Sequence, residues 1–405
     1  MVERFWFRTI KGTVFRKHRM LSRSHYRAKS VLARITASLI ATSFGLVFLI
    51  ATTAPQAWCG TLHGVFALGD PNRPIPAEIF DNRQIDGIAL RYFWNELEPA
   101  EGQFNWGPID AELAQAVEHR KMVSLGVTPG VFTPDWVYRD GAAQFSFLWD
   151  KPWGPPPCSK VRIPVPWDPV YLSKWSAFVR AMGQRYHGNP ALVSVKIEGI
   201  NAQTEELLLP HSRPGQRNAA KLVDCAPNDD VGEWQAIGYT AAKIKETWRA
   251  IAHAYLEAFP TQALVLQIGP WGTPPIDDSG GLIPKRDSNT ELAPSIISIG
   301  NAEIKGRFVV QNNGLQANWN WPQLKQIAGG ANIGFQMAWR VTNDPTCRMN
   351  HIERPCDPHA MLQLAVNRGI KAGAMYLEIY ITDLLNPQLN DVIANAQART
   401  GRAEL

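Results

Sequence analysis

Short β-rich runs alternate with amphipathic helical stretches along most of the chain, and this alternation constrains the fold more than any other feature. It predicts parallel strands joined by crossover helices. Eight β-rich runs are found, at 62–68, 87–94, 122–127, 192–200, 263–268, 308–312, 333–339 and 374–381. Eight is the strand number of a TIM-type (β/α)8 barrel, so we expect an α/β fold with one barrel over residues 58–395 and a polar tail at 396–405. An open doubly wound sheet is the alternative, but no Gly-x-Gly-x-x-Gly turn follows the first run.

The segments between these runs include five with apolar residues at helical spacing, which predicts the outer helices of the barrel. They are 109–119, 172–186, 233–258, 321–328 and 359–368. Two long insertions rich in Pro, Gly and aromatic or polar residues follow the third and fourth strands, at 130–170 and 210–232. Barrel enzymes build their sites from loops at this end of the strands, so we expect both insertions to shape a cleft.

The N-terminal segment predicts membrane targeting. Residues 1–34 are rich in Lys and Arg and contain one acidic residue, Glu3, while residues 35–54 carry no charge. A signal peptide that is removed and an anchor that stays both fit residues 35–57, so the protein is expected to be exported, as a secreted or periplasmic protein, or anchored to the inner or plasma membrane. The rest of the chain is then mildly acidic, which argues against a nucleic-acid partner.

The five cysteines fit an oxidising compartment. Cys347 and Cys356 bound a short segment, so we predict a disulfide between them. A second disulfide between Cys158 and Cys225 is expected on weaker grounds, because four cysteines allow three pairings. Cys59 lies beside the possible cleavage point. A zinc site is the competing interpretation, but the spacing shows no Cys-x-x-Cys pair.

Residues 85–110 read IDGIALRYFWNELEPAEGQFNWGPID, in which a strand carrying Arg91 leads to Trp94, Glu98, a Gly turn and a helix. This segment resembles the second-strand signature of retaining barrel glycoside hydrolases of the β-galactosidase-like and cellulase-like kind. The resemblance implies that Arg91 orients catalytic carboxylates and that Trp94 stacks on a sugar ring. Glu98 is interpreted as structural.

The third and fourth strands extend the resemblance. Trp136 follows the third strand and is either a sugar platform or a core residue. The resembling families place a general acid/base glutamate after the fourth strand, where this chain offers Glu205 and Glu206, and we prefer Glu206. Asn201 would then bond a sugar hydroxyl, although it is separated from both glutamates instead of preceding one directly.

The second carboxylate of those families ends the seventh strand, where this chain has Gln336, which cannot attack an anomeric carbon. The eighth strand supplies Glu378, a lone acid in an apolar run and our candidate nucleophile. The alternative is a core acid paired with an Arg such as Arg91. Other residues expected to line the mouth and bind substrate are Glu205, Asn312, Gln336, Trp339 and Tyr380.

The function predicted from these residues is hydrolysis of O-glycosidic bonds in an oligosaccharide or polysaccharide with retention of configuration. In this scheme Glu206 protonates the leaving oxygen, Glu378 attacks the anomeric carbon, and no metal or organic cofactor is needed. Two alternatives stay open: a barrel that only binds carbohydrate or helps to assemble polysaccharide, which the missing seventh-strand glutamate favours, and a metal-dependent hydrolase, which few histidines support.

The targeting segment gives a first prediction. A reporter enzyme that is active only after export, fused after residue 58, should be active, because basic residues before the apolar segment keep residues 1–34 on the cytoplasmic side. The measurement is reporter activity in intact cells, with a fusion after residue 34 as the control. Activity of a cytoplasmic reporter at position 58 would contradict targeting.

Overall fold

The computed structural model describes residues 61–151, 154–214, 225, 228–269, 272–318, 324–344, 347–349 and 356–400. The chain divides into two units, Met1–Pro55 and Gln56–Leu405. The predicted basic and apolar segments and Cys59 lie outside the described residues. Within the described part of the chain, no helix is long and apolar enough to span a bilayer.

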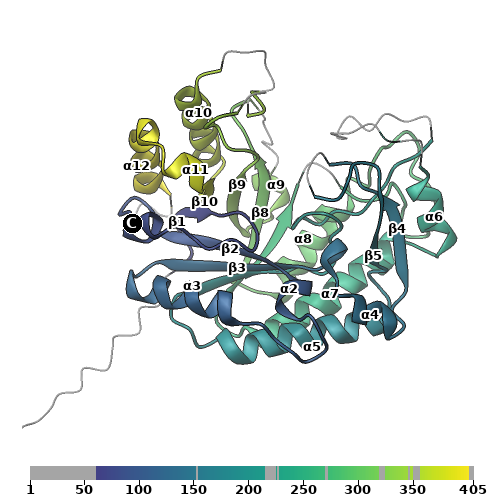
Figure 1. The fold of residues 1–405 in the computed structure, drawn as a ribbon. Coiled ribbons are helices and arrows are strands. Elements are labelled where there is room, and N and C mark those ends of the chain that lie inside the picture. Colours follow the sequence, from purple (N-terminus) through teal and green to yellow (C-terminus); the bar gives the residue numbers. More distant parts are fainter. Residues whose placement is uncertain are drawn as a thin grey trace, which may run out of the picture. The chain divides into compact units, whose positions relative to one another are not determined.

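The strands of the second unit close into an eight-stranded parallel barrel, with the order β1-β10-β9-β8-β7-β6-β3-β2 (Figure 1). Its strands are β1 (Gly64–Leu68), β2 (Gly87–Phe93), β3 (Met122–Thr128), β6 (Leu192–Lys196), β7 (Ala263–Ile268), β8 (Phe308–Leu315), β9 (Asn332–Met337) and β10 (Ala374–Tyr380). Each falls on one of the eight predicted runs, so the (β/α)8 fold is confirmed.

The predicted helices are also found, with one division. They are α3 (Gly107–Glu118), α5 (Pro169–Tyr186), α9 (Leu324–Ile327) and α10 (Pro358–Lys371), together with α6 (Asp230–Ala236) and α7 (Ala241–Ala258) in place of one helix at 233–258. Gly238, with a φ of +76°, turns the chain between α6 and α7. Thr240 then caps α7 by accepting a hydrogen bond from the Lys243 N–H at 3.0 Å.

The sequence reading missed several helices. They are α1 (Ala77–Asp81), α2 (Trp94–Leu97), α4 (Asp135–Arg139), α8 (Leu292–Glu303), α11 (Ile381–Leu384) and α12 (Asn390–Arg399). Helix α12 corrects the expected polar tail, because the helix runs through the proposed boundary at 395 and buries Val392, Ile393 and Ala396. Its contacts with β1 and α10 make it part of the barrel's outer layer.

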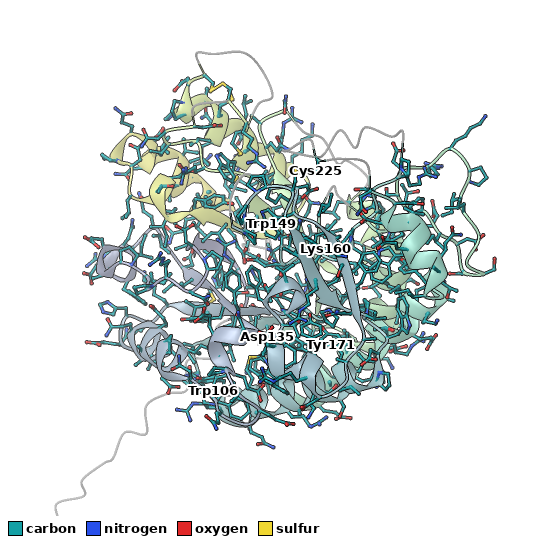
Figure 2. All side chains as sticks on the ribbon, turned by 45° about the vertical axis from the view of Figure 1, so that its right-hand side comes forward. Trp106, Asp135, Trp149, Lys160, Tyr171 and Cys225 are labelled. Atoms are coloured by element: carbon teal, nitrogen blue, oxygen red, sulfur yellow. A yellow bond between two sulfur atoms is a disulfide. The ribbon has the colours of Figure 1, made fainter. Side chains whose placement is uncertain are left out.

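The insertion after β3 folds into an antiparallel hairpin of β4 (Gln144–Leu148) and β5 (Lys160–Pro164). It packs against α6 of the second insertion, where the rings of Phe145 and Trp234 stack with centroids 3.7 Å apart. Figure 2 shows Trp149, Lys160 and Cys225 in this region. Both predicted disulfides are present, Cys158–Cys225 between the two insertions and Cys347–Cys356 in the segment after β9.

The barrel interior has an apolar part and a polar part. Side chains including Phe66, Val265, Val309 and Tyr376 form a separate apolar cluster. Further along the same strands come inward-facing polar residues such as Gln311 and Glu378. Gly334 leaves space for the Tyr376 ring, since a Cβ there would lie 2.2 Å from the ring atom that carries the hydroxyl.

We therefore expect Gly334→Ala to lower the free energy of unfolding by about 1–3 kcal/mol, because the added methyl group overpacks the interior. The Tyr376 hydroxyl, which donates to Gln311 Oε1 at 2.5 Å, would also be displaced. Urea unfolding is the measurement. Gly188→Ala is the matched control, because a Cβ at Gly188 meets no atom within 4 Å. Equal stability of the two variants would contradict this packing.

Candidate functional site

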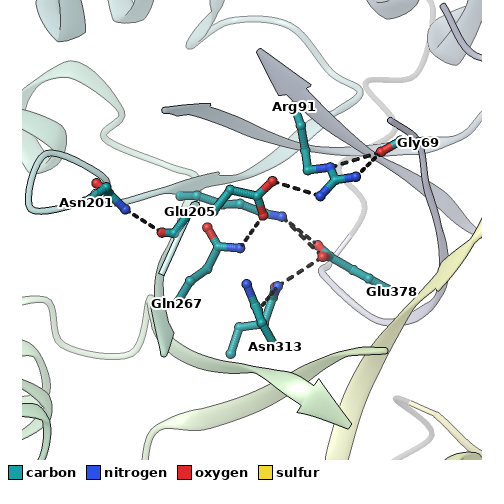
Figure 3. A network of polar contacts seen from close by, with 9 residues as sticks. Gly69, Arg91, Asn201, Glu205, Gln267, Asn313 and Glu378 are labelled. Atoms are coloured by element: carbon teal, nitrogen blue, oxygen red, sulfur yellow. Dashed lines mark hydrogen bonds and ion pairs between the residues drawn. The ribbon is translucent and has the colours of Figure 1, made fainter. Parts of the chain in front are cut away.

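Polar side chains from five barrel strands and one loop meet inside the carboxyl-terminal end of the barrel (Figure 3). Arg91 comes from β2, Lys196 from β6, Gln267 from β7, Gln311 from β8 and Glu378 from β10, while Glu205 and Glu206 come from the loop after β6. Parallel strands place their carboxyl ends at one end of the barrel, where enzymes of this fold carry out their chemistry.

Glu205 is held by two partners. Arg91 Nη1 lies 3.0 Å from Glu205 Oε1, and Gln267 Nε2 donates to Glu205 Oε2 at 3.1 Å. The Arg91 guanidinium also donates to the Gly69 carbonyl, with Nε at 2.9 Å, which fixes its plane. Burial alone would raise the pKa of Glu205, but the charges of Arg91 and Lys196 and the hydrogen bond from Gln267 outweigh it and lower the pKa. Of the three glutamates, Glu205 is the one whose pKa lies below its ordinary value.

Glu206 is in the opposite situation. Burial raises its pKa, and the nearby negative charge of Glu205 raises it further, although the side chains of Thr204 and Asn313 work against this. The side chain is buried, with 8% exposure. The pKa values of these two adjacent glutamates are therefore shifted in opposite directions.

Glu378 forms an ion pair that crosses the barrel. Lys196 Nζ lies 3.0 Å from Glu378 Oε1, and Gln311 Nε2 donates to Oε2 at 3.0 Å. Strands β6 and β10 are four positions apart in the ring of eight, so the pair joins opposite walls. Gly126 of β3 makes room for the lysine, since a Cβ there would lie 3.0 Å from Lys196 Cδ. Burial raises the pKa of Glu378 while the charge of Lys196 opposes that shift.

This arrangement corrects the alternative in which Glu378 is a core acid paired with Arg91. Arg91 makes its ion pair with Glu205, and the cation in contact with Glu378 is Lys196. A cation within a buried strand was a signal that a buried acid elsewhere must face it.

The loop that carries both glutamates is fixed by backbone contacts. Asn201 Nδ2 donates to the carbonyl oxygens of Glu205 at 2.6 Å and Glu206 at 3.1 Å. Asn201 Oδ1 accepts from the Gly199 N–H at 2.6 Å. The expectation that Asn201 binds a sugar hydroxyl is therefore wrong, because both ends of its side-chain amide hold the loop. Its effect on the glutamates is to position them.

The two tryptophans expected to bind sugar lie in the core. Trp94 is fully buried and packs edge-on against Trp136 and Trp175. Trp136 has 5% exposure, and its Nε1 donates to the Glu98 carbonyl at 3.0 Å. Neither ring has a face for a ligand, so both predictions are wrong. Glu98 accepts from Trp94 Nε1 and from the Gly102 N–H, each at 2.8 Å, which confirms its structural role.

The other residues predicted to bind substrate lie in different environments. The prediction that Asn312 binds substrate is wrong. Gln311 faces the barrel interior, and the next residue of a strand faces the opposite side. Its Oδ1 accepts from the Gly314 N–H at 3.0 Å. Gln336 is buried beside Glu378 in the strand register. Trp339 and Tyr380 are half-buried, with ring centroids 6.3 Å apart, and the guanidinium carbon of Arg348 lies 4.2 Å from the Trp339 ring centroid.

Part of the sequence also matches a known protein family. Residues 76–204 match the model of the Glyco_hydro_42 family, described as beta-galactosidase. The match indicates a glycosidase. It covers β2, β3 and β6 with Arg91 and ends one residue before Glu205, so it reaches neither member of the glutamate pair nor Glu378. A comparison with curated proteins finds no match.

Solved structures share the barrel. The catalytic domain of a beta-amylase from Paenibacillus polymyxa aligns with a TM-score of 0.54 and 10% identity, over 82% of this chain and 97% of that one. A beta-galactosidase from Rahnella sp. R3 gives the same TM-score and identity, over 85% of this chain but only 57% of that enzyme. These likenesses show the fold alone.

The cross-barrel pair gives a prediction for stability. Lys196→Met should lower the free energy of unfolding by about 3–5 kcal/mol, because it leaves the Glu378 carboxylate buried without its counter-charge. The double variant Lys196→Met/Glu378→Leu should recover most of this loss. Denaturant unfolding near neutral pH is the measurement.

The matched control is Lys245→Met, which breaks the partly exposed pair with Asp278 and should cost about 0–1 kcal/mol. A Lys196→Met variant no less stable than this control would show that the cross-barrel pair contributes little.

Proposed function

We propose that the protein hydrolyses O-glycosidic bonds of an oligosaccharide or polysaccharide by a retaining mechanism at the mouth of its barrel. The observation that carries the proposal is the meeting of the β10 carboxylate of Glu378 with Glu205, from the loop on the opposite wall, in one buried polar network (Figure 3). Glu206 follows Glu205 directly in the same loop and is also buried. A retaining enzyme needs two carboxyl groups on either side of the scissile bond, about 5–5.5 Å apart.

In this proposal Glu206 is the proton donor. A general acid must carry its proton near neutral pH, and the raised pKa of Glu206 favours that form. Glu205 is unsuited to the role, because its pKa is lowered and its carboxylate is held by Arg91. The negative charge of Glu205 instead disfavours a second negative charge on Glu206, and so helps to keep the proton on Glu206.

Glu378 is the proposed nucleophile. Its carboxylate accepts hydrogen bonds from Lys196 and Gln311, which fix the orientation of the group and oppose the rise in pKa that burial causes. Attack on the anomeric carbon would form a covalent glycosyl-enzyme with loss of the leaving group protonated by Glu206. Water activated by the Glu206 carboxylate would then release the sugar and restore both residues. Glu205 is the competing nucleophile, because it is the more fully ionised of the two.

A barrel that binds carbohydrate without cleaving it is the second candidate. Gln336 stands at the end of β9, where the resembling families have a carboxylate, and Glu378 is fully buried. A panel of labelled glycans that starts with β-galactosides, as the family match directs, separates the two functions. Binding without turnover would favour the second.

The variants Glu378→Gln, Glu206→Gln and Glu205→Gln assign the roles. Glu378→Gln should lower kcat by about 10⁴-fold or more, as expected for loss of a nucleophile. Glu206→Gln should retain activity on aryl glycosides with good leaving groups and gain rate with added azide, because azide replaces the water that needs a base. NMR of the first-formed product should show the same anomeric configuration as in the substrate.

The Glu205→Gln variant is the discriminating control. It should keep substantially more activity than Glu378→Gln. Loss of activity in Glu205→Gln with near wild-type kcat in Glu378→Gln would transfer the nucleophile role to Glu205. An inverted product would rule out the retaining mechanism.

A further inference from the structure

One buried side chain of the polar network, Asn313 at the carboxyl end of β8, has no part in the mechanism proposed above. It has 6% exposure, and Gln311 Nε2 donates to its Oδ1 at 2.8 Å (Figure 3). The register of β8 with β9 shifts between Asn312 and Leu315, an irregularity of the kind that redirects side chains beside active sites. Because the same Gln311 nitrogen donates to Glu378 Oε2 at 3.0 Å, Asn313 belongs to the network that holds Glu378.

The hydrogen bonds of Gln311 determine which end of the Asn313 amide stays free. The Tyr376 hydroxyl donates to Gln311 Oε1, so the Gln311 nitrogen faces both Glu378 and Asn313. An amide has oxygen at one end and nitrogen at the other, so the Asn313 oxygen that accepts from Gln311 leaves Nδ2 at the free end. Within the described residues this nitrogen has no hydrogen-bond partner. A buried donor in this condition costs free energy until an acceptor reaches it.

Glu206 supplies a matching acceptor. Its Oε2 also lacks a hydrogen-bond partner within the part of the chain that the structure describes. The Asn313 side chain lies near enough to oppose the rise in the pKa of Glu206 that burial causes. An unpaired donor and an unpaired acceptor are therefore neighbours. A protonated carboxyl gains little from such a donor, whereas a carboxylate gains a charge-assisted hydrogen bond.

Three other titratable groups interact with Glu206, namely Glu205 of the same loop, Glu198 just beyond β6 and Tyr380 of β10. The pKa of Glu205 is lowered, mainly by the charge of Arg91 against burial. Burial raises the pKa of Glu198 well above its ordinary value and that of Tyr380 to about 12. None of the three supplies a positive charge, so a neutral N–H donor is well suited to stabilise ionised Glu206.

We propose that Asn313 is a positioning residue that holds the Glu206 side chain in place once Glu206 has given up its proton. Gln311 orients the amide, and Asn313 Nδ2 donates to the carboxylate that must then activate water. The inference rests on the proposed retaining mechanism and deepens it, because it connects the proposed nucleophile and the proposed proton donor through two residues of one strand, β8.

Asn313→Ala is the first test. The alkaline limb of the kcat/KM profile should move upward by about one pH unit, because loss of a hydrogen bond to the charged form raises the pKa of Glu206 and keeps the acid protonated to higher pH. Near neutral pH, kcat on aryl glycosides with good leaving groups should fall by up to about tenfold, because less Glu206 is ionised to activate water. The matched control is Asn312→Ala, which removes the neighbouring amide from the opposite face of the strand and should change neither value.

Titration of Glu206 itself tests the inference without turnover. In protein labelled with ¹³C at glutamate Cδ, with the Glu206 signal assigned by its absence from Glu206→Gln, NMR should show Glu206 titrating about one pH unit higher in Asn313→Ala than in wild type or Asn312→Ala. Asn313→Asp keeps the shape and the acceptor for Gln311 but replaces the N–H donor by an oxygen, so it should raise the titration further. This variant decides the matter if Asn313→Ala does not fold.

The two proposals fail in different ways. If wild-type protein cleaves nothing in the glycan panel, the proposed function fails, and the titration still decides the role of Asn313. Glu206 titrating alike in wild type and the Asn313 variants would overturn that role, as would an equal upward shift in Asn312→Ala. In an active enzyme, an alkaline limb that Asn313→Ala leaves in place would also overturn it.

Discussion

The ion pair between Lys196 and Glu378 spans the inside of the barrel, and the arrangement of the polar interior depends on it. Both side chains are fully buried. A buried charge is tolerated only with a partner and additional hydrogen bonds, so each residue fixes where the other must lie. Gln311 accepts from Tyr376 and donates to Glu378, which connects the pair to the apolar cluster in the barrel. The same lysine contributes to the lowered pKa of Glu205.

The loop after β6 links this interior to the two insertions. Asn201 fixes the backbone of Glu205 and Glu206. Farther along the loop, the Leu207 N–H donates to the Gln267 carbonyl at 3.0 Å. The Val131 N–H, from the first insertion, donates to the Ala202 carbonyl at 2.9 Å. One segment therefore carries the proposed proton donor and contacts both β7 and the first insertion.

The motif that resembles glycoside hydrolases has a mainly structural role in this chain. Trp94, Glu98 and Trp136 form a buried group. The indole nitrogens of both tryptophans and the Glu98 carboxylate each have a hydrogen-bond partner. Arg91 alone of that motif reaches the polar network. Such a group positions the start of the first insertion relative to β2, which explains how a match over residues 76–204 can report the fold around a site without containing its carboxylates.

The sequence by itself determined the eight strands, most of the large helices and both disulfides. Strand positions follow from local β-rich runs, and the parallel order follows from the helices between them. It also singled out Glu205, Glu206 and Glu378, because acids near strand ends or within apolar runs are rare. Only the tertiary structure decided their partners. Lys196 and Glu378 are 182 residues apart along the chain but face one another across the barrel, while Arg91 reaches Glu205. Ion pairing across a closed barrel depends on which strands oppose each other in space. The same is true of whether a Trp such as Trp94 faces a ligand or the core. No local sequence pattern contains this information.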